Sequence, residues 1–350
     1  MRFPRAVAAL AVAGLAAVLP LSAQQGAPVL DVPQVSQRAT VSQVVGLTTI
    51  ALDYGRPAVK GRAIWGALVP WGEVWRTGAN INTVLSVSSR FRVGGVELPA
   101  GRYGLHTIPT QGAWTVILNK EASNWGSFSY DSTQDAVRFR ATPRAAPPME
   151  QLQFTLDDPA DSTVTVTMRW EKLALPFTLT VPTHQVVVDS LRHQLAGLQQ
   201  FWPTGWLEAA RWALANNTGL DQAAQWADRA IAIAPTFGAL SVKASVLERQ
   251  GRRAAADSLR ARAMTIATEA DVNALGYQYL GERRVEEALV LFRQNVKDYP
   301  KSWNAWDSLG EALGVAGRKP EAVEAYRKAL AMAPAGQQAR IRGAIATLSR

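Results

Sequence analysis

Hydrophobic and polar residues alternate singly over the first half of the chain. Between residues 39 and 181 the alternation recurs in short runs rich in Val, Thr, Leu, Phe and Trp, at residues 47–54, 83–88, 114–119, 136–141, 152–156 and 163–170. Because a period of two places every second side chain on one face, these runs predict strands buried on one side. About nine or ten short strands without intervening helical stretches favour an antiparallel β-sandwich or jelly-roll over a parallel sheet.

Turn residues separate these predicted strands. Gly94 and Gly95 stand between two short alternating runs, at residues 91–93 and 96–98, and glycine adopts the positive φ of a two-residue turn without steric cost. The sequence therefore predicts a β-hairpin there. Asp157-Asp158-Pro159 and Pro147-Pro148 indicate two further connections.

The period changes to that of a helix after Pro182. Residues 183–203 predict a connecting helix that stops before Pro203. Further on, Val272-x-x-Leu275-Gly276-x-x-Tyr279 with Ala288, Phe292 and Pro300 returns 34 residues later as Trp306-x-x-Leu309-Gly310-x-x-Leu313 with Ala322, Tyr326 and Pro334. This segment resembles tetratricopeptide repeats, which stack helix pairs into a solenoid.

Two weaker copies of the repeat precede these, so we expect about four units over residues 204–334 and a capping helix at residues 335–350. The copies depart from the repeat pattern at two points. Arg211 occupies a position at a helix crossing where the repeat pattern has a small residue. Thr268 stands where the other units end in a proline. The outer units are therefore expected to be distorted.

The first residues predict an exported protein. Arg2 and Arg5 precede an apolar run at residues 6–19, which is shorter than the ~20 residues that span a bilayer. The small residue Ala23 is suited to peptidase cleavage, so we expect a signal peptide at residues 1–23 and a flexible linker at 24–35. The mature chain is then periplasmic or secreted, with no stable membrane insertion.

Composition narrows the function. Of 350 residues, 48% are hydrophobic and 19% charged, which excludes disorder for most of the chain. The absence of cysteine excludes disulfides, thiolate nucleophiles and cysteine-ligated zinc. The net charge of +9 is spread over both halves, so no nucleic-acid partner is expected.

Residues 55–80 break the strand rhythm with five glycines, three tryptophans and four cations. A loop of this length inside a domain is more often functional than not. Its motifs Asp53-Tyr54-Gly55-Arg56-Pro57 and Val74-Trp75-Arg76-Thr77-Gly78-Ala79-Asn80, together with Leu98-Pro99-Ala100-Gly101-Arg102-Tyr103, occur in order. On these motifs, residues 36–182 resemble an uncharacterised family of exported bacterial β-domains, known as domain of unknown function 2911. The resemblance implies a module and no activity.

The loop and its neighbours form a candidate ligand site, because guanidinium groups bind carboxylate or phosphate and indole rings stack on planar or sugar faces. Its members are Arg56, Lys60, Arg62, Trp75, Arg76, Asn80 and His106. The alternation of residues 103–109 places His106 on the face opposite Tyr103 and Leu105, where it could act as a base or donor beside Arg76. The structural alternative is that the tryptophans are core, the arginines bridge to Asp53 and Glu73, and His106 is a packing residue.

Known catalytic and metal motifs are missing. Neither G-x-S-x-G nor S-x-x-K occurs, and the three histidines lack a metal-ligand spacing. Asp157, Asp158 and Asp161 have no calcium-loop spacing and are interpreted as turn residues, as are Asp131 and Asp135. We therefore expect no catalytic residue, metal or cofactor.

The concave face of the repeats is the candidate partner groove, for a protein or peptide. The resemblance places there Glu208, Trp212, Ser241, Ser245, Asn273, Tyr277, Asn304, Asp307 and Glu311. The leading hypothesis is an exported, non-enzymatic binding or scaffold protein whose β-domain takes a small anionic or sugar-like ligand. Two alternatives stay open. One is a hydrolase or lyase of envelope glycans that uses Asp53, Glu73 and His106, and the other is a purely structural protein.

Overall fold

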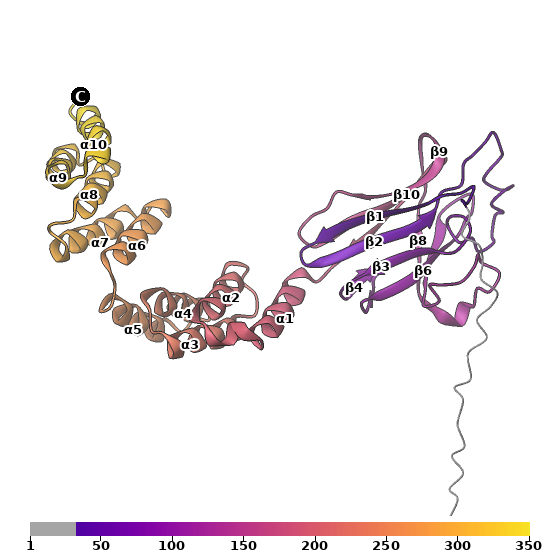
Figure 1. The fold of residues 1–350 in the computed structure, drawn as a ribbon, viewed down its shortest axis with the longest axis horizontal. Coiled ribbons are helices and arrows are strands. Elements are labelled where there is room, and N and C mark those ends of the chain that lie inside the picture. The colour runs from indigo at the N-terminus through magenta and orange to yellow at the C-terminus, as the bar shows by residue number, and fades with distance from the viewer. Residues whose placement is uncertain (1–32) are drawn as a thin grey trace, which may run out of the picture.

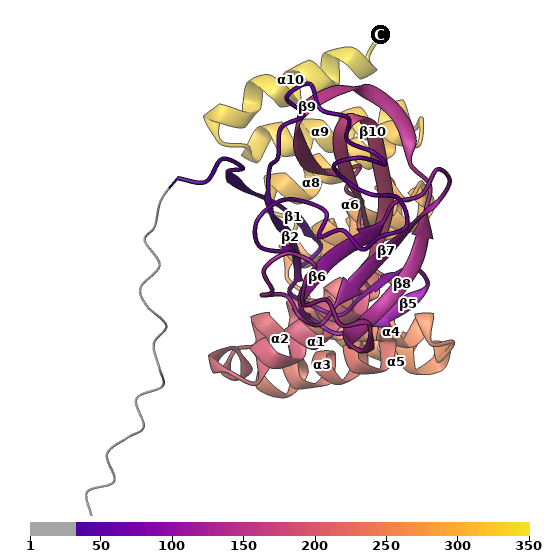
Figure 2. The same ribbon diagram turned by 90° about the vertical axis from the view of Figure 1, so that its right-hand side faces the viewer.

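The computed structural model describes residues 33–350. A β-domain is followed by a row of helices that leads away from it (Figure 1) and lies behind it in the view of Figure 2. The expected signal peptide, its cleavage point after Ala23 and most of the expected linker lie outside the described residues.

The β-domain consists of two antiparallel sheets that enclose one hydrophobic core. The six-stranded sheet has the order β1-β2-β3-β6-β7-β8 and the four-stranded sheet the order β5-β4-β10-β9. The strands are β1 (Arg38–Val45), β2 (Thr48–Gly55), β3 (Thr83–Val87), β4 (Phe91–Val93), β5 (Val96–Leu98), β6 (Gly101–Ile108), β7 (Trp114–Asn119), β8 (Asp135–Ala141), β9 (Arg144–Asp157) and β10 (Thr163–Thr180). The predicted antiparallel sandwich is confirmed.

Alternating burial explains why these segments are strands. In β2, Ile50, Leu52 and Tyr54 point into the core, while the residues between them face outward and are less buried. The predicted hairpin pairs Phe91 with Leu98 and Val93 with Val96, and Gly94 and Gly95 both have positive φ. Both features follow from local sequence.

The prediction for Pro147 and Pro148 was wrong, because both lie within β9 rather than in a connection. β9 is an edge strand, so a residue there can lack a backbone N–H without leaving a neighbouring strand unpaired.

The second half of the described chain contains ten α-helices. They are α1 (Thr183–Leu195), α2 (Pro203–Ala215), α3 (Leu220–Ile233), α4 (Phe237–Arg249), α5 (Arg253–Met264), α6 (Glu269–Gly281), α7 (Val285–Asp298), α8 (Trp303–Val315), α9 (Lys319–Met332) and α10 (Ala335–Leu348). α2 to α9 pack as four successive antiparallel pairs, and α10 packs on α9. The fold class is therefore β followed by repeat-like α, as predicted.

The connecting helix is shorter than predicted. α1 ends at Leu195, and a 3-10 turn at Leu198–Phe201 follows it. The extended backbone of Gly197 interrupts the helix between them. Within α1, Val186 packs against the β-domain core while Val188 belongs to the core of the first repeats, so one helix joins both.

Two of the small residues in the repeat pattern sit at helix crossings. A Cβ at Gly276 would lie 2.5 Å from the ring of Phe292, and one at Gly310 would lie 3.0 Å from the ring of Tyr326. The glycines thus allow α6 and α8 to approach the aromatic residues of α7 and α9. No described helix is both long enough and apolar enough to cross a membrane.

The stack of repeats is interrupted between α5 and α6. α3 packs on α4 and α7 packs on α8, but α5 and α6 share almost no contacts, and Figure 1 shows them joined by a connector. The only fully buried residues of α5 are Ala256 and Ala263. No hydrophobic cluster among the described residues continues from α5 into α6.

Candidate functional sites

Two tryptophans of the 55–80 loop belong to the core of the sandwich. Trp75 stacks on Trp170 with ring centroids 5.7 Å apart, and Trp65 contacts Trp75, Trp114 and Trp170 edge-on. Trp114 and Trp170 are fully buried. The geometry favours the structural alternative for these rings, and of the three tryptophans in the loop only Trp71 is exposed.

Most polar residues of the predicted ligand site form hydrogen bonds within the β-domain. Arg56 donates to the carbonyl of Leu152. Arg62 donates to the carbonyls of residues 58 and 59, and Asn80 donates to the carbonyl of Ser36. The backbone N–H of Lys60 donates to the Glu150 carboxylate. The side chains of Arg56, Arg62 and Asn80 are therefore held by backbone carbonyls of the β-domain itself.

Arg76 and His106 are brought together. Trp75 and Thr107 form an antiparallel bridge with two backbone hydrogen bonds of 2.8 and 2.9 Å. The residues next to this pair, Arg76 and His106, point to the opposite face of the sheet, away from the core. Both lie under the same short segment, since Nη1 of Arg76 is near Gly126 and Nδ1 of His106 is 3.5 Å from Oγ of Ser127.

Arg76 has no carboxylate partner among the described residues. Its Nε is buried without a hydrogen bond, and burial lowers the pKa of the guanidinium from its ordinary value. The described residues contain no ion pair between the loop arginines and Asp53 or Glu73, so this part of the structural alternative is wrong. Asp53 pairs instead with Arg38 at 2.7 Å.

His106 is almost completely buried, at 2% exposure, beside the ring of Tyr130. Burial lowers the pKa of His106 to about 4, against a smaller opposing effect of Asp135. The imidazole is therefore neutral at pH 7 and can donate only one hydrogen bond.

Residues 120–134, which connect β7 to β8, form the segment that covers Arg76 and His106. A hydrogen-bond network holds this covering segment in place. The Asp135 carboxylate accepts from Tyr130 at 2.7 Å, from Asn119 at 2.8 Å and from Arg138. Asp135 was predicted to be a turn residue, but it is the first residue of β8 and part of this network. Asp131, for which the same prediction was made, does cap a short 3-10 turn. The pairing of β7 with β8 brings Asn119 to Asp135, so no local sequence pattern could predict this network.

Sequence reasoning also missed two exposed rings in the covering segment. Trp125 is 66% and Phe128 84% exposed, and the two rings stack at 5.8 Å with an interplanar angle of 16°. They lie on either side of Gly126, where an added Cβ would be 3.5 Å from Nη1 of Arg76. The only available signal was the isolated Trp125-Gly126 pair between two predicted strands.

No group of three or more acidic or histidine side chains in residues 33–350 is arranged to hold a metal ion. Asp53, Glu73 and His106 are not linked to one another by any hydrogen bond or ion pair in the described part of the chain. Glu73 lies exposed in the loop, while Asp53 is engaged by Arg38.

The repeats contain an open cavity of about 760 Å³ at the interruption between α5 and α6. Its walls come from α2, α4, α5 and α6, with Arg284 and Leu291. Of the nine predicted groove residues, Ser241 and Ser245 line it. Glu208 is exposed on α2, and Trp212 packs against the first repeat core.

The remaining groove residues form contacts along the second half of the repeats. Tyr277 on α6 donates to Glu311 on α8 at 2.8 Å, and Arg340 on α10 pairs with the buried Asp307 of α8 at 2.6 Å. Asn304 donates to Glu269, while the side-chain oxygen of Asn273 is buried without a partner. Burial raises the pKa of Asp307.

Comparison with known proteins agrees with this division of the chain. Residues 36–179 match the model of a family described as a protein of unknown function (DUF2911). No curated protein sequence is significantly similar to the chain.

Solved structures resemble the helical region. PilF of Pseudomonas aeruginosa is 20% identical, with 42% of this chain and 67% of that chain covered and a TM-score of 0.29. YrrB, described as a TPR protein with an unusual peptide-binding site, is 13% identical, with 46% and 82% covered and a TM-score of 0.28. For the Cut9-Hcn1 hetero-tetramer the identity is 14%, with 48% and 33% covered and a TM-score of 0.28. At these identities the likeness concerns the fold alone. The chain joins a β-domain that resembles the DUF2911 family to helices whose 34-residue recurrence resembles that of tetratricopeptide repeats.

Proposed function

We propose that this protein is an exported protein-interaction scaffold whose repeat region binds a segment of a partner protein. One observation carries the proposal, namely the open cavity of about 760 Å³ between helices of the repeats. Its volume lies within the range of roughly 300 to 1,000 Å³ typical of ligand pockets. Helix pairs that stack only on their neighbours leave such surfaces free for partners. Export rests on the leader-like residues 1–23, and the secreted chain should begin at Gln24 in N-terminal sequencing.

Selection from a display library of random twelve-residue peptides tests the scaffold function, with the full mature chain as bait. We expect selected peptides to bind the chain and to protect α2, α4 and α6 in hydrogen–deuterium exchange, because these helices line the cavity. Failure to select any binder, or protection confined to the β-domain, would contradict the proposal.

A second candidate function, for the β-domain, is the binding of a small anionic ligand at Arg76. The unpaired, partly buried guanidinium favours it, and the exposed rings of Trp125 and Phe128 on either side of Gly126 supply a surface for stacking. An anion would provide the hydrogen-bond partner that Arg76 lacks in the described chain.

Replacing Arg76 by alanine should weaken binding of glucuronate or inorganic phosphate at least about tenfold, since one charge-assisted bond contributes on the order of 1.5 kcal/mol or more. The free energy of unfolding should change by less than ~0.5 kcal/mol, because no carboxylate loses its partner. Trp125 fluorescence measures the binding. Arg62→Ala is the control, since Arg62 contacts only loop carbonyls. A large loss of stability in Arg76→Ala without any fluorescence response of the wild-type chain would exclude this site.

A further inference from the structure

The cavity at the interruption between α5 and α6 has a chemical character that identifies its occupant more closely. We propose that it binds an acidic segment of a partner protein, with a carboxylate on Arg211 and Arg249 and an apolar side chain between α5 and α6. The proposal rests on the scaffold function and adds the chemistry of the partner.

The interrupted stack leaves an apolar surface uncovered. Met264, Leu275 and Leu291 line the cavity and are only partly buried. In the neighbouring repeats the corresponding space is closed, because α3 packs on α4 and α7 packs on α8. An apolar side chain of a partner segment would therefore bury surface that the chain itself does not cover.

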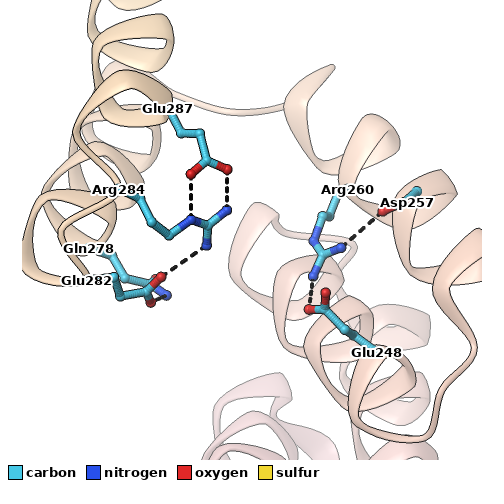
Figure 3. Close-up of polar contacts among 7 residues, drawn as sticks. All are labelled: Glu248, Asp257, Arg260, Gln278, Glu282, Arg284 and Glu287. Carbon is cyan, nitrogen blue, oxygen red and sulfur yellow. Dashed lines mark hydrogen bonds and ion pairs between the residues drawn. The ribbon is translucent and has the colours of Figure 1, made fainter.

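The carboxylates that line the cavity already have partners within the chain. Glu248 pairs with Arg260, and Glu282 pairs with Arg284 at 3.0 Å, as Figure 3 shows. Arg260 and Arg284 are in turn held by Asp257 and Glu287, outside the lining. Asp271 caps the start of α6 with Thr268. None of these acids is free to receive a cation from a partner.

Two arginines that line the cavity have no carboxylate partner among the described residues. Arg211 on α2 has no hydrogen bond or ion pair within residues 33–350, and Arg249 on α4 contacts only the amide oxygen of Asn217, at 3.5 Å. A Cβ at Gly238 would lie 3.1 Å from Nη2 of Arg211, so the glycine leaves room for the guanidinium at the cavity wall. The unmatched charge of the cavity is thus positive and lies on its α2 and α4 side.

Together these features select the occupant. A segment with an aspartate or glutamate next to a large apolar residue would neutralise Arg211 and Arg249 and fill the space beside Leu275. A basic segment would meet the same two free arginines and no free acid, so the cavity disfavours it.

The peptide display selection also tests this inference, with the full mature chain and its Arg211→Glu/Arg249→Glu variant as parallel baits. Peptides selected on the wild-type chain should be enriched in Asp and Glu beside Leu, Ile, Phe or Met. A fluorescein-labelled peptide from this pool should bind the variant at least about tenfold more weakly in anisotropy titrations. Its Glu→Arg or Asp→Arg counterpart should bind the variant better than it binds the wild-type chain.

The matched control is Arg253→Glu/Arg262→Glu, an equal reversal of two charges at exposed residues of α5 that are not part of the cavity wall. It should leave peptide binding unchanged. Peptides without acidic enrichment, or equal affinity for the wild-type and double-variant chains, would overturn the inference and leave the scaffold function standing. If no peptide is selected at all, the scaffold function fails as well.

Discussion

Replacing Trp114 by alanine is expected to destabilise the β-domain by about 3 to 5 kcal/mol, the usual cost of removing a fully buried tryptophan. Trp114 has no exposed surface, its ring lies 4.9 Å from that of Trp65, and its indole N–H donates to the carbonyl of Thr110 at 3.0 Å. The substitution would therefore leave a cavity beside Trp65 in the tryptophan cluster and an unpaired carbonyl at Thr110. Hydrogen–deuterium exchange of β2 and β6 in denaturant measures the loss.

Trp125→Ala is the matched control for this experiment. Its side chain is 66% exposed, so the same substitution should change the stability of the same domain by less than ~0.5 kcal/mol. Equal losses for the two variants would mean that Trp114 is not part of the core.

Acidification between pH 6.5 and about 4 should destabilise the β-domain through His106. Burial lowers the pKa of His106 to about 4, whereas the same side chain in the unfolded chain titrates near its ordinary value of 6.5. In this window the unfolded state binds a proton that the native state does not, so stability falls as the pH falls. A difference of this size corresponds to at most about 3 kcal/mol.

The comparison of wild-type and His106→Gln chains isolates this effect. The variant should lose stability less steeply between pH 6.5 and 4, because its side chain does not titrate. His193→Gln, at an exposed position on α1, should keep the wild-type slope. Parallel pH profiles for the wild-type and His106→Gln chains would show that the imidazole is accessible to protons in the native state.

Local patterns predicted the class of the fold and most of its elements. Single alternation gave β2 and β7 because burial on one face of a strand requires only a period of two. The Gly94-Gly95 turn predicted its hairpin because positive φ is a property of those two residues. The 34-residue recurrence likewise predicted the pairs α6/α7 and α8/α9, since each pair buries its apolar face against a neighbour nearby in sequence.

Contacts between residues distant in sequence decided the candidate sites. The sequence suggests that Trp75 is exposed, but in the structure its ring packs on Trp170. Arg76 is one of four cations of the loop in the sequence, and the bridge between Trp75 and Thr107 places it beside His106. The stack is interrupted after α5 because α5 and α6 barely contact each other. The repeat pattern in the sequence continues across this point, so it could not predict the missing contact. By itself the sequence determined which segments are strands and helices, because those depend on neighbouring residues. Only the tertiary structure decided which cations remain unpaired, because pairing depends on residues that the fold brings together from far apart in the chain.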